Sequence, residues 1–111
     1  MIVEERIYTL HPGMAGAYMK NYEENGLAVQ QPILGNMVGY FYTEFGPLNQ
    51  VIHMWGYDSF EERARRRAEL MKDERWQANL QKARPMIRAQ ENKLLIPAPF
   101  SPVGGERPAK L

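Results

Sequence analysis

The feature that most constrains the fold is a pair of neighbouring segments, residues 36–45 and 50–57, in which apolar or aromatic side chains occupy most positions. Both segments are rich in the β-branched and aromatic residues that favour strands. Between them, residues 46–49 read Gly-Pro-Leu-Asn, which is the composition of a turn. The sequence therefore predicts an antiparallel hairpin.

The hairpin is unusual because neither of its faces is polar. If Phe45 pairs with Gln50, alternate residues of the two strands share a face. One face then carries Val38, Tyr40, Tyr42, Glu44, Val51, His53, Trp55 and Tyr57, and the other carries Gly39, Phe41, Thr43, Ile52, Met54 and Gly56. An open antiparallel sheet with one face in water would alternate apolar with polar residues, so we expect both faces to be covered.

The remaining chain divides into two strands and two helical regions. Residues 2–10 and 86–96 have strand composition. Apolar residues at steps of three and four predict a helix over 15–26, and residues 27–32 either extend it or form a separate turn. Ser59 and Glu62 fit a capping box at the start of a second helix that ends near residue 72, and Asp73 can cap a short third helix that ends before Pro85.

The element order is therefore strand, helix, strand, strand, helix, strand. This order predicts an α+β fold of the ferredoxin-like type, with an antiparallel sheet and helices on one face. We expect one domain over residues 1–103 and a flexible tail over 104–111, where prolines and glycines replace periodic apolar residues.

We expect the chain to associate with a second copy of itself. With helices on one face of the sheet, the aromatic residues Tyr40, Tyr42, Trp55 and Tyr57 are predicted on the other, where they would be exposed in a monomer. Packing two identical sheets face to face would cover them, giving a dimeric α/β barrel. The predicted partner is thus the chain itself, as a homodimer or a higher oligomer.

Charge and composition exclude several classes of partner. The 14 Lys and Arg residues nearly balance the 13 Asp and Glu residues, so no field attracts nucleic acid. The sequence has no cysteine, no stretch long and apolar enough for a membrane span and no signal-peptide pattern at its start. We therefore expect a cytoplasmic protein that binds neither nucleic acid nor membranes.

His53 is the candidate catalytic residue. Among aromatic neighbours it would be desolvated and neutral, and could act as a general base; the alternative is a hydrogen-bonded core or interface histidine. Its neighbours on the same face, Tyr40, Tyr42, Glu44, Trp55 and Tyr57, could line a cavity for a flat aromatic ligand, or simply form the dimer core.

Polar residues elsewhere admit two interpretations each. Gln90 and Asn92 share one face of the last strand and could bind a ligand, or hydrogen-bond within the sheet or to a partner. The arginines at 63, 65, 66 and 67 could attract a carboxylate or phosphate, or pair with nearby glutamates on a solvated face. No metal site and no cofactor are predicted, because the two histidines lie far apart in different elements.

Several blocks in the same order resemble the NIPSNAP family. The longest is residues 39–59, GYFYTEFGPLNQVIHMWGYDS, followed by 61–68, 76–77, 90–92 and 99–102. The resemblance covers roughly residues 1–103 and implies a dimeric α/β-barrel fold, without implying a reaction.

Three functions remain open at this point. The chain could be an enzyme without a metal, either a proton-transfer catalyst or a cofactor-free monooxygenase-like protein acting on an aromatic molecule. It could hold a small hydrophobic or aromatic molecule without converting it. It could instead be a structural or interaction protein whose dimer is the functional unit, with the proline-rich arm from residue 97 embracing a partner.

Overall fold

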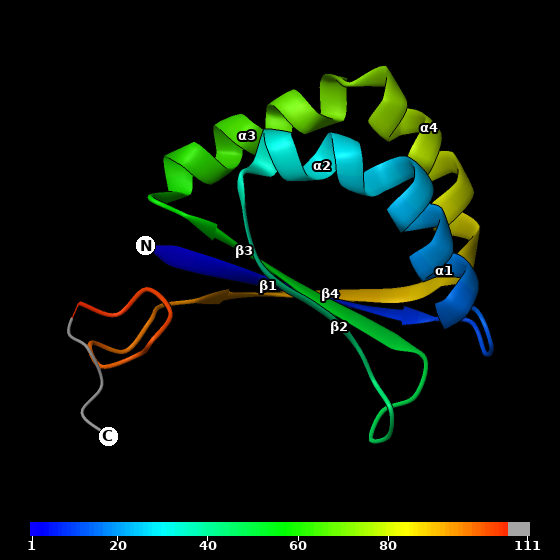
Figure 1. The fold of residues 1–111 in the computed structure, drawn as a ribbon, viewed down its shortest axis with the longest axis horizontal. Helices are drawn as coiled ribbons and strands as arrows, with labels where there is room; N and C mark the ends of the chain where they lie inside the picture. The colour runs from blue at the N-terminus through cyan, green and yellow to red at the C-terminus, as the bar shows by residue number, and fades with distance from the viewer. Residues whose placement is uncertain (107–111) are drawn as a thin grey trace.

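The computed structural model describes residues 1–106 of the chain. Its four strands form one antiparallel sheet in the order β2-β3-β1-β4. The strands are β1 (Ile2–Leu10), β2 (Asn36–Tyr42), β3 (Gln50–Tyr57) and β4 (Ile87–Leu95). Strand β1 lies in the interior of the sheet and pairs with both β3 and β4. The predicted ferredoxin-like α+β fold is confirmed (Figure 1).

All helices arch over one face of this sheet (Figure 1). The first helical run comprises α1 (Ala15–Asn21), a π-helical segment (Tyr22–Gly26) and α2 (Leu27–Leu34), so residues 27–32 extend the helix. The second run comprises α3 (Phe60–Lys72), α4 (Glu74–Ala83) and a 3₁₀ turn (Arg84–Met86). No helix of residues 1–106 is both long and apolar enough to cross a membrane.

Side-chain caps fix where the second helical run begins and turns. The Ser59 hydroxyl accepts a hydrogen bond from the Glu62 backbone N–H at 3.1 Å, as a capping box requires. The Glu62 carboxylate accepts from the Asp58 backbone N–H at 2.6 Å, one residue earlier than the usual box. The Asp73 carboxylate accepts from the backbone N–H groups of Arg75 and Trp76 and so starts α4. Both predicted helix starts are correct.

The hairpin differs from its predicted register by two residues. Thr43, rather than Phe45, pairs with Gln50, and its N–H donates to the Gln50 carbonyl at 3.0 Å. The loop is therefore longer than predicted, spanning 43–49, with Asn49 at a φ of 61°. Because strand side chains alternate with a period of two, a two-residue shift leaves Tyr40 and Tyr42 on the predicted face.

The prediction of which face the helices cover was wrong. Helices pack on the aromatic face, where Trp55 is 0% exposed and Tyr57 and His53 are 2% exposed. The physical reason lies in the helices themselves: their inward residues, including Tyr22, Val29, Leu70 and Trp76, form one core cluster with Trp55 and Tyr57. Large rings bury the most apolar area in a helix-on-sheet layer, so this face is the core of the domain.

No helix of residues 1–106 covers the opposite face of the sheet (Figure 1). Pairing partners in an antiparallel sheet share a face, and Phe41, Ile52, Ile7 and Glu91 stand in one such row across β2, β3, β1 and β4. Met54, Glu5 and Lys93 follow in the next row. We call this the open face. Part of the predicted tail, residues 107–111, lies outside the described residues.

Candidate functional site

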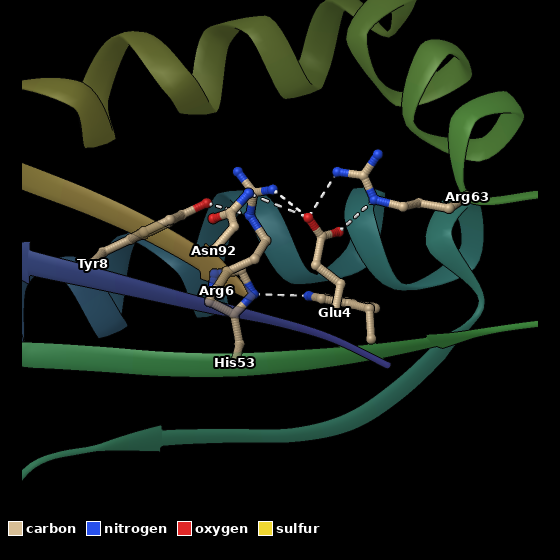
Figure 2. A network of polar contacts seen from close by, with 7 residues as sticks. Glu4, Arg6, Tyr8, His53, Arg63 and Asn92 are labelled. Carbon is tan, nitrogen blue, oxygen red and sulfur yellow. Dashed lines mark hydrogen bonds and ion pairs between the residues drawn. The ribbon is translucent and has the colours of Figure 1, made fainter. Parts of the chain in front are cut away.

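A buried carboxylate stands at the centre of the helix-covered face. Glu4 on β1 is only 3% exposed and accepts two hydrogen bonds from Arg63 on α3, at 3.1 and 2.7 Å. Arg6 donates to the same carboxylate at 3.1 Å and Asn92 on β4 at 3.2 Å (Figure 2). A carboxylate offers about four acceptor sites. Both oxygens of Glu4 are therefore engaged by the protein, Oε1 by Arg63 and Oε2 by Arg63, Arg6 and Asn92.

Glu4 stays ionised despite its burial. Burial raises the pKa of a carboxyl group, but the Arg63 hydrogen bonds and the charges of Arg6, Arg63 and Arg67 outweigh it, so the pKa of Glu4 lies below its ordinary value. Arg6 also donates to the Tyr8 hydroxyl at 2.8 Å. The network thus joins three elements, β1, β4 and α3, around one negative charge.

His53 on β3 is held by its neighbour on the same strand face. The Trp55 indole N–H donates to His53 Nδ1 at 2.7 Å (Figure 2). An indole nitrogen can only donate, so Nδ1 must be unprotonated and the neutral ring must carry its proton on Nε2. His53 Nε2 and the Tyr57 hydroxyl are buried and have no hydrogen-bond partner within residues 1–106. Leaving either of these buried polar atoms without a hydrogen bond costs free energy.

The environment of His53 keeps it neutral. Burial lowers the pKa of His53 to about 3, with the nearby Arg6 charge as the second cause. The Tyr40 ring stacks on the imidazole with ring centres 4.7 Å apart, and the Tyr8 ring meets it edge to face at 5.0 Å. Tyr22 stacks in turn on Tyr40 at 4.7 Å. A column of aromatic rings thus runs from β3 towards the first helical run.

A cavity of about 480 Å³ lies between the sheet and the helices beside this column. Its aromatic wall consists of Tyr8, Tyr18, Tyr22, Tyr40, His53 and Trp76. Uncharged amides line it at Gln30, Asn79 and Gln90, and apolar side chains include Leu80, Ala83 and Ile87. The volume falls in the range of small-molecule sites, and the mixture of ring faces with a few polar groups is typical of them.

The charges that line the cavity have one sign. Its charged lining residues are Arg6, Arg67, Arg84 and Arg88, and no Asp or Glu of residues 1–106 is among the lining. Arg6 is engaged by Glu4 and Tyr8. Arg67 on α3 makes no hydrogen bond or ion pair with any residue in the described part of the chain, and burial together with the Arg6 charge lowers its pKa. The cavity is thus electropositive.

Of the residues predicted as a site, the structure brings three to the cavity. Tyr40, His53 and Gln90 line it. Trp55 and Tyr57 are buried in the core, and Asn92 binds Glu4 instead of facing the cavity.

Two predicted site residues lie elsewhere. Tyr42 is 63% exposed at the end of β2, and Glu44 is exposed in the hairpin loop because β2 ends earlier than predicted. Within residues 1–106, no three His, Cys, Asp or Glu side chains gather in an arrangement that could hold a metal ion.

Several site residues were missed from the sequence, although signals existed. Glu4, Arg6 and Tyr8 alternate on β1, and polar residues on one face of an interior strand are unusual. Arg63 and Arg67 are four residues apart, so both lie on one face of α3, where they turn towards the sheet. Arg66 behaves as the solvated-face interpretation expects and pairs with Glu62 at 2.8 Å.

Comparison with known proteins gives consistent matches. The family model described as NIPSNAP matches residues 3–102. A Dictyostelium discoideum protein called NipSnap homolog is 37% identical over 94 residues, which cover 85% of this chain and 41% of that protein. The chain thus spans about two fifths of the length of the curated relatives it matches.

Solved structures agree in fold. The crystal structure of a NIPSNAP family protein from Agrobacterium tumefaciens is 52% identical, with a TM-score of 0.90 and coverage of 92% of this chain and 97% of that one. An antibiotic biosynthesis monooxygenase matches with a TM-score of 0.63 and 10% identity, covering 88% and 99% of the two chains. At that identity the likeness shows the fold alone.

Proposed function

We propose that this chain, which belongs to the NIPSNAP family, is a homodimeric protein that binds a small planar molecule between the sheet and the helices. The proposal is argued from the site, because a fold of this kind hosts more than one activity. The observation that carries this proposal is the tyrosine-lined cavity of about 480 Å³. The matched family residues contain the whole cavity lining.

The aromatic wall determines the class of molecule. Ring faces prefer offset or edge contact with another π-system, and the stacked Tyr22, Tyr40 and His53 rings already follow this geometry. A flat ligand placed beside them would continue the column. The three uncharged amides of the lining could orient its polar substituents.

The geometry favours His53 as a hydrogen-bond donor over the general base first considered. A base needs a free lone pair, and the Nδ1 lone pair accepts from Trp55. The Nε2–H is a buried donor without a partner in the described chain. A ligand oxygen that reached it would recover the penalty of about 1–3 kcal/mol for an unpaired buried group. If the protein is an enzyme, such a donor would stabilise an oxygen anion.

Dimerisation through the open face is the second part of the proposal. Phe41 is 53% exposed, and Ile7, Ile52 and Met54 are only half-buried on a sheet face that no helix in the described part of the chain covers. A contiguous apolar area of this kind is typical of a protein interface. The interaction-protein alternative shares this dimer, and the two functions differ in whether the cavity holds a ligand.

Calorimetric titration with 2-naphthol, a neutral planar probe, tests the proposal. Leu80 lines the cavity from α4, whereas Ala78 on the same helix is exposed. We expect the wild type to bind the probe, Leu80→Trp to weaken binding at least about tenfold by filling the space, and Ala78→Trp to bind like the wild type. Absence of binding by the wild type, or equal effects of both tryptophans, would refute the cavity as the site.

A further inference from the structure

We propose that the ligand of this cavity carries a carboxylate and that the guanidinium of Arg67 receives it. This inference rests on the proposed function, which places a planar ligand in the cavity, and it adds the charge class of that ligand. It assigns a binding role to a residue of the arginine run on α3 that would otherwise count as surface charge.

The position of Arg67 separates it from the other arginines of α3. Arg63, one turn earlier on the same helix face, is held by Glu4 through two hydrogen bonds. Arg66 is held by Glu62 and by the Ile33 carbonyl, and Arg65 is exposed to solvent. Arg67 is half-buried, like Arg63 and Arg66, but it alone of the four lines the cavity, and it has no partner within residues 1–106.

Glu4 is the negative charge that acts on Arg67, but it is shared with two other arginines. Its carboxylate accepts four hydrogen bonds, from Arg63 twice, from Arg6 and from Asn92, and none from Arg67 within residues 1–106. Arg6, Arg63 and Arg67 thus share a single negative charge, and burial, followed by the charge of Arg6, lowers the pKa of Arg67. Buried charges are normally paired. The excess positive charge faces the cavity, so a counter-charge supplied there would be favourable.

The geometry of the Arg67 guanidinium group favours a carboxylate as its partner. A guanidinium presents parallel N–H groups that match two carboxylate oxygens, and such pairs are both stronger and more directional than neutral hydrogen bonds. Arg84 and Arg88 also line the cavity but are exposed to water. They can attract an anion over a distance, whereas Arg67, which is more sheltered, can hold it.

The aromatic column indicates the chemistry of the part of the ligand that does not contact Arg67. Tyr22, Tyr40 and His53 offer ring faces, and Arg67, which is half-buried and has no partner among residues 1–106, lines the same cavity. One ligand that used both would be a planar aromatic acid. A planar neutral molecule would use the rings and leave the arginine unpaired.

A matched pair of probes tests this inference: 2-naphthoate, which is ionised near neutral pH, and 2-naphthol, which is not. Each is titrated calorimetrically into the wild type, Arg67→Gln, Arg67→Lys and Arg65→Gln. Arg65→Gln removes the same charge from the exposed side of the same helix and is the control. A charge-assisted pair predicts that Arg67→Gln weakens 2-naphthoate roughly 10–100-fold while 2-naphthol changes less than about twofold.

The outcomes separate the two proposals. Preference for the acid that is lost in Arg67→Gln, partly kept in Arg67→Lys and retained in Arg65→Gln supports the inference. Equal binding of both probes by the wild type, or an acid preference that survives Arg67→Gln, overturns it and leaves the cavity proposal standing. Binding of neither probe overturns both. Unchanged 2-naphthol binding also shows that Arg67→Gln is folded.

Discussion

At the scale of single residues, the hydrogen bond from Trp55 limits the chemistry that is available to His53. The two lie on the same face of β3, and the indole can only donate its hydrogen bond. This contact fixes the imidazole tautomer without help from a carboxylate. A ring that is neutral, oriented and without a free lone pair is suited to hold an oxygen of a ligand rather than to remove a proton.

The neutrality of His53 predicts a pH-dependent stability. Its pKa is about 3 in the folded protein and near 6.5 in the unfolded chain, so between these values the unfolded state binds a proton that the native state excludes. Stability therefore falls as pH falls below 6.5, by about 2 kcal/mol between roughly pH 7.5 and 5. Above pH 6.5 the residue makes no such contribution. Urea unfolding followed by tryptophan fluorescence across this interval measures the loss.

The matched variant is His53→Asn, which keeps an oxygen that can accept from Trp55 but does not titrate. We expect its stability to vary less with pH than that of the wild type over the same interval. Glu4 does not interfere, because its pKa is lowered from 4.5 and it is protonated only at more acidic pH. Identical pH profiles for the two proteins would show that His53 is protonated in the folded state.

Residue-scale prediction from sequence reached the aromatic environment of His53 but missed the charge network. Strand alternation places Tyr40, His53 and Trp55 together because their positions depend on local pairing. The contacts of Glu4 reach Arg63 and Asn92, which are 59 and 88 residues away. No local pattern indicates which of several arginines meets that carboxylate, so the network depends on how α3 docks on the sheet.

At the scale of elements, the helical run from α1 to α2 contains a π-helical segment at Tyr22–Gly26. Such segments are inserted single turns that often occur near functional sites. Here the segment begins at Tyr22, which lines the cavity, and ends at the buried Gly26 beside Asn79 of α4. The irregular turn thus brings the first helical run against α4 at the cavity.

We expect alanine substitutions at two glycines of this helical run to change the free energy of unfolding in opposite directions. A Cβ at Gly26 would lie 2.8 Å from a Tyr22 ring carbon and 3.2 Å from the Asn79 amide, whereas a Cβ at Gly16 would meet nothing within 4 Å. Gly26→Ala should therefore lower the free energy of unfolding by roughly 1–3 kcal/mol. Gly16→Ala should raise it by up to about 1 kcal/mol through helix propensity.

Chemical denaturation of both variants measures these changes, and 2-naphthol titration adds a second readout. Gly26→Ala displaces a cavity wall, so we expect it to weaken the probe as well, while Gly16→Ala leaves binding unchanged. A stabilised Gly26→Ala protein would mean that Tyr22 and Asn79 move aside at no cost, and that the tight packing of the segment is unimportant.

Elements were predicted well wherever a local signal marks their ends. The caps at Ser59 and Asp73 gave two helix starts, and the limits of β1 and β3 agree with the structure. The end of β2 was placed three residues late, at Phe45 instead of Tyr42, because Thr43, Glu44 and Phe45 have strand composition but lie in the loop. The hairpin loop is longer than the four-residue turn that the composition indicated, and it ends at Asn49, which has a positive φ.

At the scale of the whole molecule, the open face of the sheet predicts a dimer. Ile52 lies between Phe41 and Ile7, on two neighbouring strands of the open face. A lysine in the centre of such an interface would bury an unpaired charge, which costs several kcal/mol. Ile52→Lys should therefore weaken the dimer by roughly 100-fold or more. Native mass spectrometry and sedimentation across a dilution series measure this change.

Gln81→Lys is the control, because it adds the same charge at an exposed position of α4 on the other side of the sheet. It should leave the dimer intact. A monomeric wild type would exclude the proposed dimer, and a dimer that withstands Ile52→Lys would place the interface away from the open face.

The order of elements sufficed to predict the fold, because a ferredoxin-like sheet follows from two strand-helix-strand units. The covered face did not follow, because both faces of the hairpin are apolar and either could have formed the core. What decided between them was the size of the side chains: Tyr8, Tyr40, Trp55 and Tyr57 pack against the rings of the helices. Steric fit of this kind is not encoded in an alternation pattern.

The place of β1 inside the sheet has a consequence for how the chain acquires its structure during synthesis. One neighbour, β3, precedes α3 and α4, but the other, β4, begins only at Ile87. Until β4 emerges from the ribosome, one edge of β1 has no partner and Glu4 lacks Asn92. Such pairings between distant segments form slowly and leave strand edges exposed meanwhile, so the nascent chain passes through a stage at which binding by chaperones would be most useful.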